Sequence, residues 1–203
     1  IADIYENREI SEEIIDGYIY SLLEKEAENS EIYQSAEAFF DDKLTQGIES
    51  TVLTPDLNGN PDEGKIKSVS YSFDSKSINE FCNDNSISKN TLFIASTILN
   101  LNKFTFSDKT LMTTIFNGRS SPSYFNTQGF LVKTVPFIIN NENRQVSLRD
   151  FIKSVDQTWK DTLKNSAYPY IKIAEKYQLK PEFFYAYHEF LGSDEMMINN
   201  REY

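Results

Sequence analysis

Two apolar runs in the middle of the chain form its clearest pattern of hydrophobic and polar positions. Residues 111–117 alternate between two sets of side chains, Leu111, Thr113, Ile115 and Met112, Thr114, Phe116. Residues 129–139 are apolar almost throughout, apart from Lys133 and Thr134. The pattern predicts a strand with one wetter face, a strand buried on both faces and a loop of turn residues between them. We take this strand pair as the element around which the chain is organised.

The residues before this pair predict two helices that pack on each other. We expect Ser11 to begin the first helix and Ser30 to cap the second, because both are preferred N-cap residues. The apolar faces of the two helices are expected to be Ile14, Ile15, Tyr18, Ile19, Leu22, Leu23 and Ile32, Ala36, Phe39, Phe40, Leu44.

The next two segments have different patterns. Residues 47–65 contain prolines and an Asn-Gly pair, which predicts an irregular surface segment. Residues 66–73 then alternate, with Val69, Tyr71 and Phe73 on one side and serines on the other. This alternation predicts a strand with a solvated face.

Further helices and one further strand complete the predicted order. We expect helices at about 76–83, at about 89–101, from Ser147 with Asp150 as a capping-box partner, and at about 170–177 after Pro169, and a last strand at 182–190. This mixture predicts an α/β (α+β) fold in which helices pack on a mixed β-sheet.

Composition narrows the possible partners. The chain has 203 residues, which suits one domain or one lobe of a larger one. Its net charge is −11, from 31 acidic and 20 basic residues, and no cluster of lysines or arginines could neutralise a run of phosphates. Nucleic acid and anionic membranes are therefore not expected partners.

Cysteine usage and hydropathy indicate a compartment. Cys82 is the single cysteine, so an internal disulfide is impossible and no cysteine-based metal site is expected. A reducing cytoplasm is the simplest location. No apolar run approaches the roughly 20 residues that a membrane span needs, and residues 1–10 do not resemble a signal peptide.

The central loop and the strand after it carry the first family motif. The segment GRSSPSYFNTQGFLVKTVPF resembles the part of nonribosomal peptide synthetase condensation domains that runs from a Gly-Arg turn to a strand of the form G-x-F-V-N-T-x-P-L-R. The matching positions are Gly118 and Arg119 in the turn and Gly129, Val132, Thr134 and Pro136 in the strand. Lys133 and Ile138 depart from the pattern, which usually has Asn and Arg there.

A second motif follows at the family's spacing. Residues 165–171, NSAYPYI, are similar to the family's (H/N)QD(Y/V)PFE motif and match it at Asn165, Tyr168 and Pro169. The two motifs and the predicted order of elements together span most of the chain. The sequence is therefore identified as resembling a condensation domain of the chloramphenicol-acetyltransferase-like superfamily.

The resemblance implies a fold and a function for the whole domain. In the family, two lobes enclose a tunnel that admits phosphopantetheine arms from two carrier proteins, and an amine attacks a thioester there to form an amide. The catalytic HHxxxDG motif lies in the first lobe and is absent here. Residues 1–203 are thus expected to be the C-terminal lobe, with residues 1–10 the end of the preceding helix.

The resemblance also implies roles for residues and partners. Gly129, Val132, Lys133 and Thr134 are the expected wall of the substrate tunnel, and no catalytic or metal-binding residue is expected in this lobe. The expected partners are the N-terminal lobe, carrier proteins with their phosphopantetheine arms and an adenylation domain; no cofactor is expected to bind directly. The alternatives are an epimerising, cyclising or ester-forming variant, or a non-catalytic domain that recruits a partner protein.

Several side chains of types that can act in catalysis or binding have a simpler structural explanation. His188 has no carboxylate on its own strand face, so we expect it to be structural. Cys82 is expected to be a small buried hydrophobe, and Arg119 to pair with a carboxylate near its turn. The serines at 120–121 have no triad partners nearby in the sequence. Lys133 would be costly inside a buried strand unless it reached a partner, a cavity or, as we expect, the lobe edge.

Overall fold

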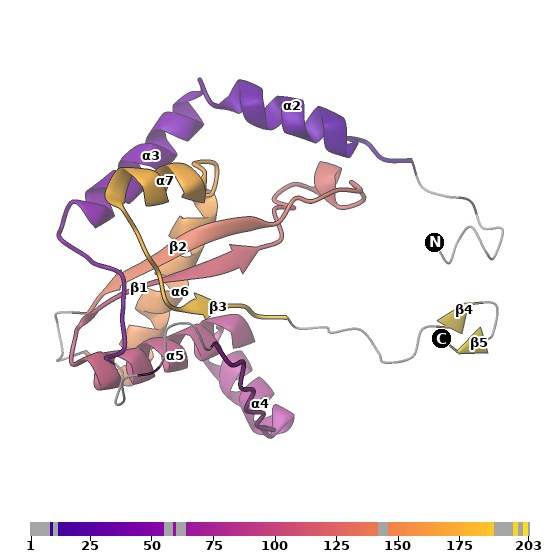
Figure 1. The fold of residues 1–203 in the computed structure, drawn as a ribbon. Coiled ribbons are helices and arrows are strands. Elements are labelled where there is room, and N and C mark those ends of the chain that lie inside the picture. The colour runs from indigo at the N-terminus through magenta and orange to yellow at the C-terminus, as the bar shows by residue number, and fades with distance from the viewer. Residues whose placement is uncertain are drawn as a thin grey trace.

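The computed structural model describes residues 9, 12–54, 59, 64–141 and 146–188, and the backbone of residues 197–198 and 201–202. Figure 1 shows the arrangement of the elements. They are α2 (Gly17–Ala27), α3 (Glu31–Leu44), α4 (Ser75–Asn85), α5 (Lys89–Thr105), β1 (Lys109–Phe116), the short 3₁₀ helix η1 (Pro122–Tyr124), β2 (Lys133–Asn140), α6 (Leu148–Lys164), α7 (Tyr170–Tyr177), β3 (Phe184–Tyr185), β4 (Met197–Ile198) and β5 (Arg201–Glu202). None of the helices among these residues is long and apolar enough to cross a membrane.

The predicted mixed sheet is confirmed, with β1 at its centre. β1 pairs antiparallel with β2 and parallel with β3. The Thr113 amide donates to the Phe183 carbonyl oxygen at 3.0 Å, so the backbone polar groups of Thr113 point toward β3. Its partner in β2 is Pro136, which therefore occupies a non-hydrogen-bonded position of the β1–β2 ladder. Proline lacks an amide proton, and at this position it breaks no ladder bond.

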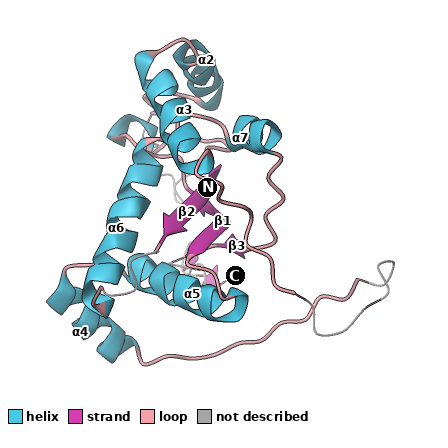
Figure 2. Cartoon of the chain, turned by 90° about the vertical axis from the view of Figure 1, so that its left-hand side faces the viewer, coloured by secondary structure: helices cyan, strands magenta, loops and turns pink. Residues whose placement is uncertain are grey.

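Alternate side chains of the strand pair enter two separate cores. Met112 and Phe137 face a cluster formed with α5 and α6, whose other buried members are Ile94, Ala95, Ile98, Leu101, Ile139, Phe151, Ile152 and Val155. Leu111 and Ile138 face a cluster formed with α3 and α7, completed by Tyr33, Ala36, Phe40, Leu44, Ile48, Tyr168 and Ile173. Figure 1 shows α3 and α7 above the sheet and α5 below it, and Figure 2 shows α6 running alongside it. The sheet is thus buried on both faces.

Two details of the predicted strand pair are wrong. The first strand has no wetter face, because both cores cover residues 110–114, including the threonines. The second strand begins at Lys133 rather than at Gly129. Residues 129–132 lie outside the ladder, where Phe130 is 90% exposed and Leu131 is buried.

Helix caps were predicted well where a serine or a proline marks them. Ser30 caps α3 and Ser147 caps α6, each accepting a bond from a backbone amide three residues later. Pro169 is the N-cap residue of α7, which spans the predicted residues. The predicted helices at 76–83 and 89–101 are α4 and α5, slightly longer than expected. The starts of α3 and α6 could be predicted because a serine caps each of them, whereas Pro169 makes no side-chain capping bond.

The first predicted helix differs in its start and its buried face. Ser11 lies outside the described residues, and α2 begins at Gly17 with Asp16 as its cap, at 2.8 Å from the Ile19 amide. Its buried side chain is Tyr20, whereas Tyr18 is exposed. The expected packing of the two helices on each other is also wrong, since α2 and α3 run away from their junction (Figure 1).

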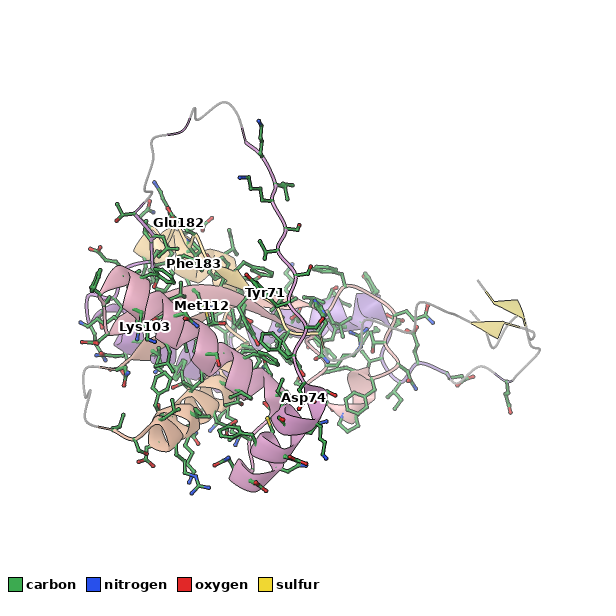
Figure 3. The ribbon with its side chains drawn as sticks, turned by 90° about the horizontal axis from the view of Figure 1, so that it is seen from below. Tyr71, Asp74, Lys103, Met112, Glu182 and Phe183 are labelled. Atoms are coloured by element: carbon green, nitrogen blue, oxygen red, sulfur yellow. The ribbon has the colours of Figure 1, made fainter. Side chains whose placement is uncertain are left out.

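The predicted strand at 66–73 is wrong. These residues are extended but have no ladder partner among the described residues, and Ile66 is almost fully exposed. Figure 3 shows Tyr71 on this stretch just before Asp74, which caps α4. Alternation supplies a strand-like backbone, but a strand also needs a neighbouring edge to accept its hydrogen bonds. The irregular segment at 47–65 holds no helix or strand in its described residues.

A polar network joins α3 to α7 behind the second core. The Lys176 ammonium lies 3.0 Å from Glu37 and 2.8 Å from Asp41. Hydrogen bonds from Lys176 and then Tyr168 hold the pKa of Glu37 below its ordinary value. Partial burial works to raise the pKa of Asp41, but hydrogen bonds from Lys176 and Tyr177 outweigh it and lower that pKa. Both carboxylates are therefore more stable ionised in the folded chain.

This network predicts a pH dependence of stability. A carboxyl whose folded pKa is depressed stabilises the fold above its unfolded pKa, and this stabilisation is lost as the pH falls through the folded pKa. We expect Tm to fall on acidification below about pH 5, and to fall less in Lys176→Met, which lacks the shared cation. Thermal melts followed by circular dichroism between pH 7 and 3 measure this. Parallel curves for the two proteins would contradict it.

Candidate functional site

A hollow of about 800 Å³ lies between α2, the start of β2 and the turn from α6 to α7. Its walls are mainly aromatic and aliphatic, from Phe130, Val132, Tyr168, Tyr170 and Ile171. Lys133 and Thr134 from β2 and Glu24 from α2 add polar groups. A mostly apolar hollow of this size with a few convergent polar groups is typical of a small-molecule site.

The loop after β1 holds α2 over this hollow. The Thr127 hydroxyl donates to the Ile15 carbonyl oxygen at 2.5 Å, and the rings of Tyr20 and Tyr124 meet edge to face at 5.1 Å. Gly17 is required at the start of α2, because a Cβ there would lie 2.8 Å from the Gln128 carbonyl oxygen. The loop and α2 therefore form one side of the hollow together.

An ion pair crosses from α2 to β2. Lys133 Nζ lies 2.6 Å from Glu24 Oε1, and the Lys133 side chain is 24% exposed against 47% for Glu24. The Tyr20 hydroxyl donates to the same carboxylate oxygen at 3.1 Å. Burial, and then the neighbouring Glu24 charge, raise the pKa of Tyr20 well above its usual range. Lys133 thus reaches both a partner and the hollow, where we had expected it to extend to the lobe edge.

The second motif forms the opposite wall. Tyr168 is buried, donates to Glu37 at 3.1 Å and packs edge to face on Tyr33. Pro169 starts α7, and Asn165 ends α6 by donating its side-chain amide to the Asp161 carbonyl oxygen at 2.8 Å. The motif residues therefore fix the turn that the hollow uses as a wall.

The Gly-Arg turn stabilises the loop between β1 and β2. Gly118 has a φ of +73°, and a Cβ there would lie 1.7 Å from the Leu131 carbonyl oxygen. Among the described residues Arg119 has no carboxylate partner, which we had expected; it donates to the Thr127 carbonyl oxygen at 2.9 Å and to that of Asn117. The guanidinium therefore holds the two ends of the loop together.

The predicted residues fall into two groups. Val132, Lys133 and Thr134, the expected tunnel wall, line the hollow together with Tyr168 and Pro169 of the second motif. The other predicted residues, Gly118, Arg119, Gly129, Pro136 and Asn165, shape its surroundings without lining it. Sequence reasoning missed Glu24 and Tyr170. The need of Lys133 for a partner was the one available signal for Glu24, and it did not identify which acid would serve.

The other candidate side chains lie elsewhere. Cys82 is buried on α4, and burial raises the pKa of its thiol, as expected for a small hydrophobe. His188 is exposed, and its catalytic exclusion stays a prediction. The Ser121 hydroxyl accepts from the Ser123 amide at the start of η1. No group of three or more metal-ligating side chains comes together in the described part of the chain.

Comparison with known proteins assigns the arrangement to a family. The model of the condensation domain matches residues 1–185. The chain belongs to the condensation-domain family. The predicted resemblance is therefore confirmed at the level of the family. A comparison with curated protein sequences found no match.

Solved condensation domains share the fold at low sequence identity. The first condensation domain of the calcium-dependent antibiotic synthetase superposes with a TM-score of 0.71 at 11% identity, covering 99% of this chain and 46% of that one. The condensation enzyme VibH gives 0.68 at 17% identity, covering 88% and 42%. The four-domain synthetase AB3403 gives 0.65 at 18% identity, covering 82% and 13%. The chain spans less than half the length of each of these proteins.

The superpositions confirm the predicted fold class. Helices packed on a small mixed sheet are the arrangement shared with these condensation domains. The two segments that carry the family motifs line the hollow together with α2, although those segments are about thirty residues apart in the sequence.

Proposed function

We propose that residues 1–203 form the C-terminal lobe of a nonribosomal peptide synthetase condensation domain. The domain would join carrier-bound aminoacyl or peptidyl thioesters by an amide bond. The observation that carries this proposal is that Val132, Lys133 and Thr134 of the first motif and Tyr168 and Pro169 of the second line one hollow. Membership of the family and the coverage of less than half of each related protein support it.

The two lobes would divide the work. The other lobe would supply the histidine of HHxxxDG as a base or as a group that positions the attacking amine. This lobe would supply a wall against which the thioester end of a carrier's phosphopantetheine arm is held. The hollow is large enough for such a group, and its apolar walls would exclude water while Thr134 and Lys133 offer polar contacts. Holding two reactants in place accounts for much of the rate in a reaction of this type.

The proposed partners follow from this role. They are the N-terminal lobe, two carrier proteins and an adenylation domain that loads an amino acid, as in a multidomain synthetase such as AB3403. The excess of acidic residues, with a net charge of −11, agrees with protein rather than nucleic acid as the partner. We place this assembly in the cytoplasm, in agreement with the single cysteine.

The experiment uses the complete domain with its neighbouring carriers. Carriers loaded with aminoacyl-phosphopantetheine are mixed with the domain, and carrier-bound dipeptide is measured by mass spectrometry. We expect dipeptide from the native protein, and none after the first-lobe motif histidine is replaced by alanine. A folded native domain that binds loaded carriers but forms no amide or ester would favour the non-catalytic, recruiting alternative and contradict the proposal.

A substitution at Gly129 tests the part that this lobe plays. Gly129 has a φ of +156°, which L side chains rarely adopt, and a Cβ there would already be in van der Waals contact with Gly17 Cα at 3.6 Å and a Leu131 methyl group at 3.5 Å, so a large side chain would strain the loop against α2. We expect Gly129→Trp to slow dipeptide formation by roughly a hundredfold, because misplacement by about 1 Å can have that effect. Adenylation of the amino acid should be unchanged. Normal dipeptide formation by the folded variant would remove this loop from the site.

A further inference from the structure

The Lys133–Glu24 pair places a cation inside a mostly apolar hollow. Lys133 comes from the first residue of β2, and its register opposite Phe116 of β1 fixes its backbone. Its side chain is the less exposed partner of the pair. Within the described part of the chain, Glu24 is the acid that neutralises it. A lysine held this way keeps its ammonium directed into the hollow.

The two partners differ in how easily they can leave the pair. Glu24 projects from the surface of α2 and is about half exposed, so water can solvate its carboxylate once it leaves the pair, although the Tyr20 hydroxyl then loses its acceptor. The same charge-assisted bond is lost whichever partner leaves, but the Lys133 ammonium is the less exposed of the two, so its charge is the costlier one to leave unpaired. An entering ligand can therefore replace Glu24 more easily than Lys133, and the group that replaces a carboxylate on an ammonium is another anion.

Two other charged side chains, Glu28 and Lys25, line the hollow. Lys172 lies 3.2 Å from the Glu28 carboxylate. Lys25, on the surface of α2, adds a second positive charge to the rim. Around these groups the walls from Val132, Tyr170 and Ile171 fit an aliphatic chain.

We propose that this hollow binds a substrate side chain that ends in a carboxylate, and that Lys133 is the residue that selects it. This inference rests on the proposed function, because the substrate is taken to be an acyl or aminoacyl thioester. The carboxylate replaces Glu24 on the Lys133 ammonium, while the aliphatic part of the chain contacts the apolar walls. The carboxylate can belong to the donor thioester or to the acceptor thioester, and the experiment below distinguishes these two cases.

A purely structural role for the pair predicts a different result. If the pair only fastened α2 to β2, removing either charge would weaken the site in the same direction. If Lys133 selects an anion, the two changes act in opposite directions. Lys133→Met removes the receptor for the carboxylate, whereas Glu24→Gln removes its competitor and keeps an acceptor for the Tyr20 hydroxyl.

The experiment uses the complete condensation domain and competing pairs of carrier-bound substrates. Glutamyl and glutaminyl thioesters are supplied together, first on the donor carrier and then on the acceptor carrier, and the ratio of products is measured. We expect the native protein to favour the glutamyl substrate in one of the two arms. Lys133→Met should lower that preference by at least about tenfold, and Glu24→Gln should raise it. Lys133→Arg should retain it, and Lys103→Met, an exposed lysine on α5 labelled in Figure 3, should leave the ratio unchanged.

Binding is measured in a separate experiment, so that the selection of a carboxylate and the proposed formation of an amide are tested independently. Glutaryl-pantetheine and its carboxamide analogue are titrated into the same proteins, and the amide resonances of residues 130–134 are followed by NMR. Tighter binding of the carboxylate, weakened in Lys133→Met and strengthened in Glu24→Gln, supports the inference even if no amide is formed. No preference for the carboxylate, or changes of the same sign in the two variants, would overturn it, whether or not the domain makes dipeptides.

Discussion

Replacing Phe137 by alanine is expected to lower the free energy of unfolding by about 3–5 kcal/mol. Phe137 is fully buried in β2 and lies opposite Met112 of β1, and its ring packs against Trp159 of α6 at 6.2 Å between centroids. The side chain therefore links the sheet to the helix layer. The strand ladder holds the backbone in place, so the cavity left by the ring can collapse only partly.

Urea denaturation followed by far-ultraviolet circular dichroism measures this change. The matched control is Phe130→Ala, since Phe130 is 90% exposed and its loss is expected to change stability by less than about 0.5 kcal/mol. Equal midpoints for the two variants would mean that Phe137 does not join the two layers.

The strand pair could be predicted from sequence because the pattern of consecutive apolar residues reflects burial on both faces. The residues on both faces of the strands are apolar or threonine. This pattern fits a strand covered by helices on both faces of its sheet. The threonines misled the prediction of a wetter face. A threonine can be buried when its hydroxyl finds a partner, as the Thr113 hydroxyl does in the Phe183 carbonyl oxygen.

The strand predicted at 66–73 shows the limit of local pattern. Its alternation is as clear as that of residues 111–117, yet Val69 and Tyr71 are exposed and no strand lies beside them in the described structure. Residues 111–116 pair with β2, and Thr113 and Thr114 also pair with β3, both of which lie later in the chain. Pairing of this kind depends on tertiary arrangement, which one segment's sequence does not encode.

The candidate site could be predicted in part for a similar reason. The motif residues of β2 are contiguous, so the sequence pointed to Val132, Lys133 and Thr134 together. Glu24 lies on α2, more than a hundred residues earlier, and reaches Lys133 because the loop after β1 holds that helix over the strand. Nothing in the periodicity of α2 distinguishes Glu24 from the other acids of that helix.

Replacing Gly118 by alanine is expected to lower the free energy of unfolding by more than the backbone conformation alone explains. A φ of +73° costs an L-residue about 1–2 kcal/mol. The added Cβ would also lie 1.7 Å from the Leu131 carbonyl oxygen, a backbone atom that can move only if the loop separates from the residues leading into β2. Leu131 is buried, so that separation exposes it and displaces the wall formed by Val132 and Lys133.

Gly47→Ala isolates the conformational part of this effect. Gly47 has a φ of +70°, but a Cβ there would meet no atom within 4 Å. We expect Gly47→Ala to show only the cost of its φ, and Gly118→Ala to exceed it by at least about 2 kcal/mol in thermal or urea denaturation, within the range of strongly destabilising substitutions. In the complete domain Gly118→Ala should also lose dipeptide formation while Gly47→Ala keeps it, because only Gly118 holds the loop against the strand that lines the hollow. Equal stability and equal activity in the two variants would show that the contact between Gly118 and Leu131 does not position that strand.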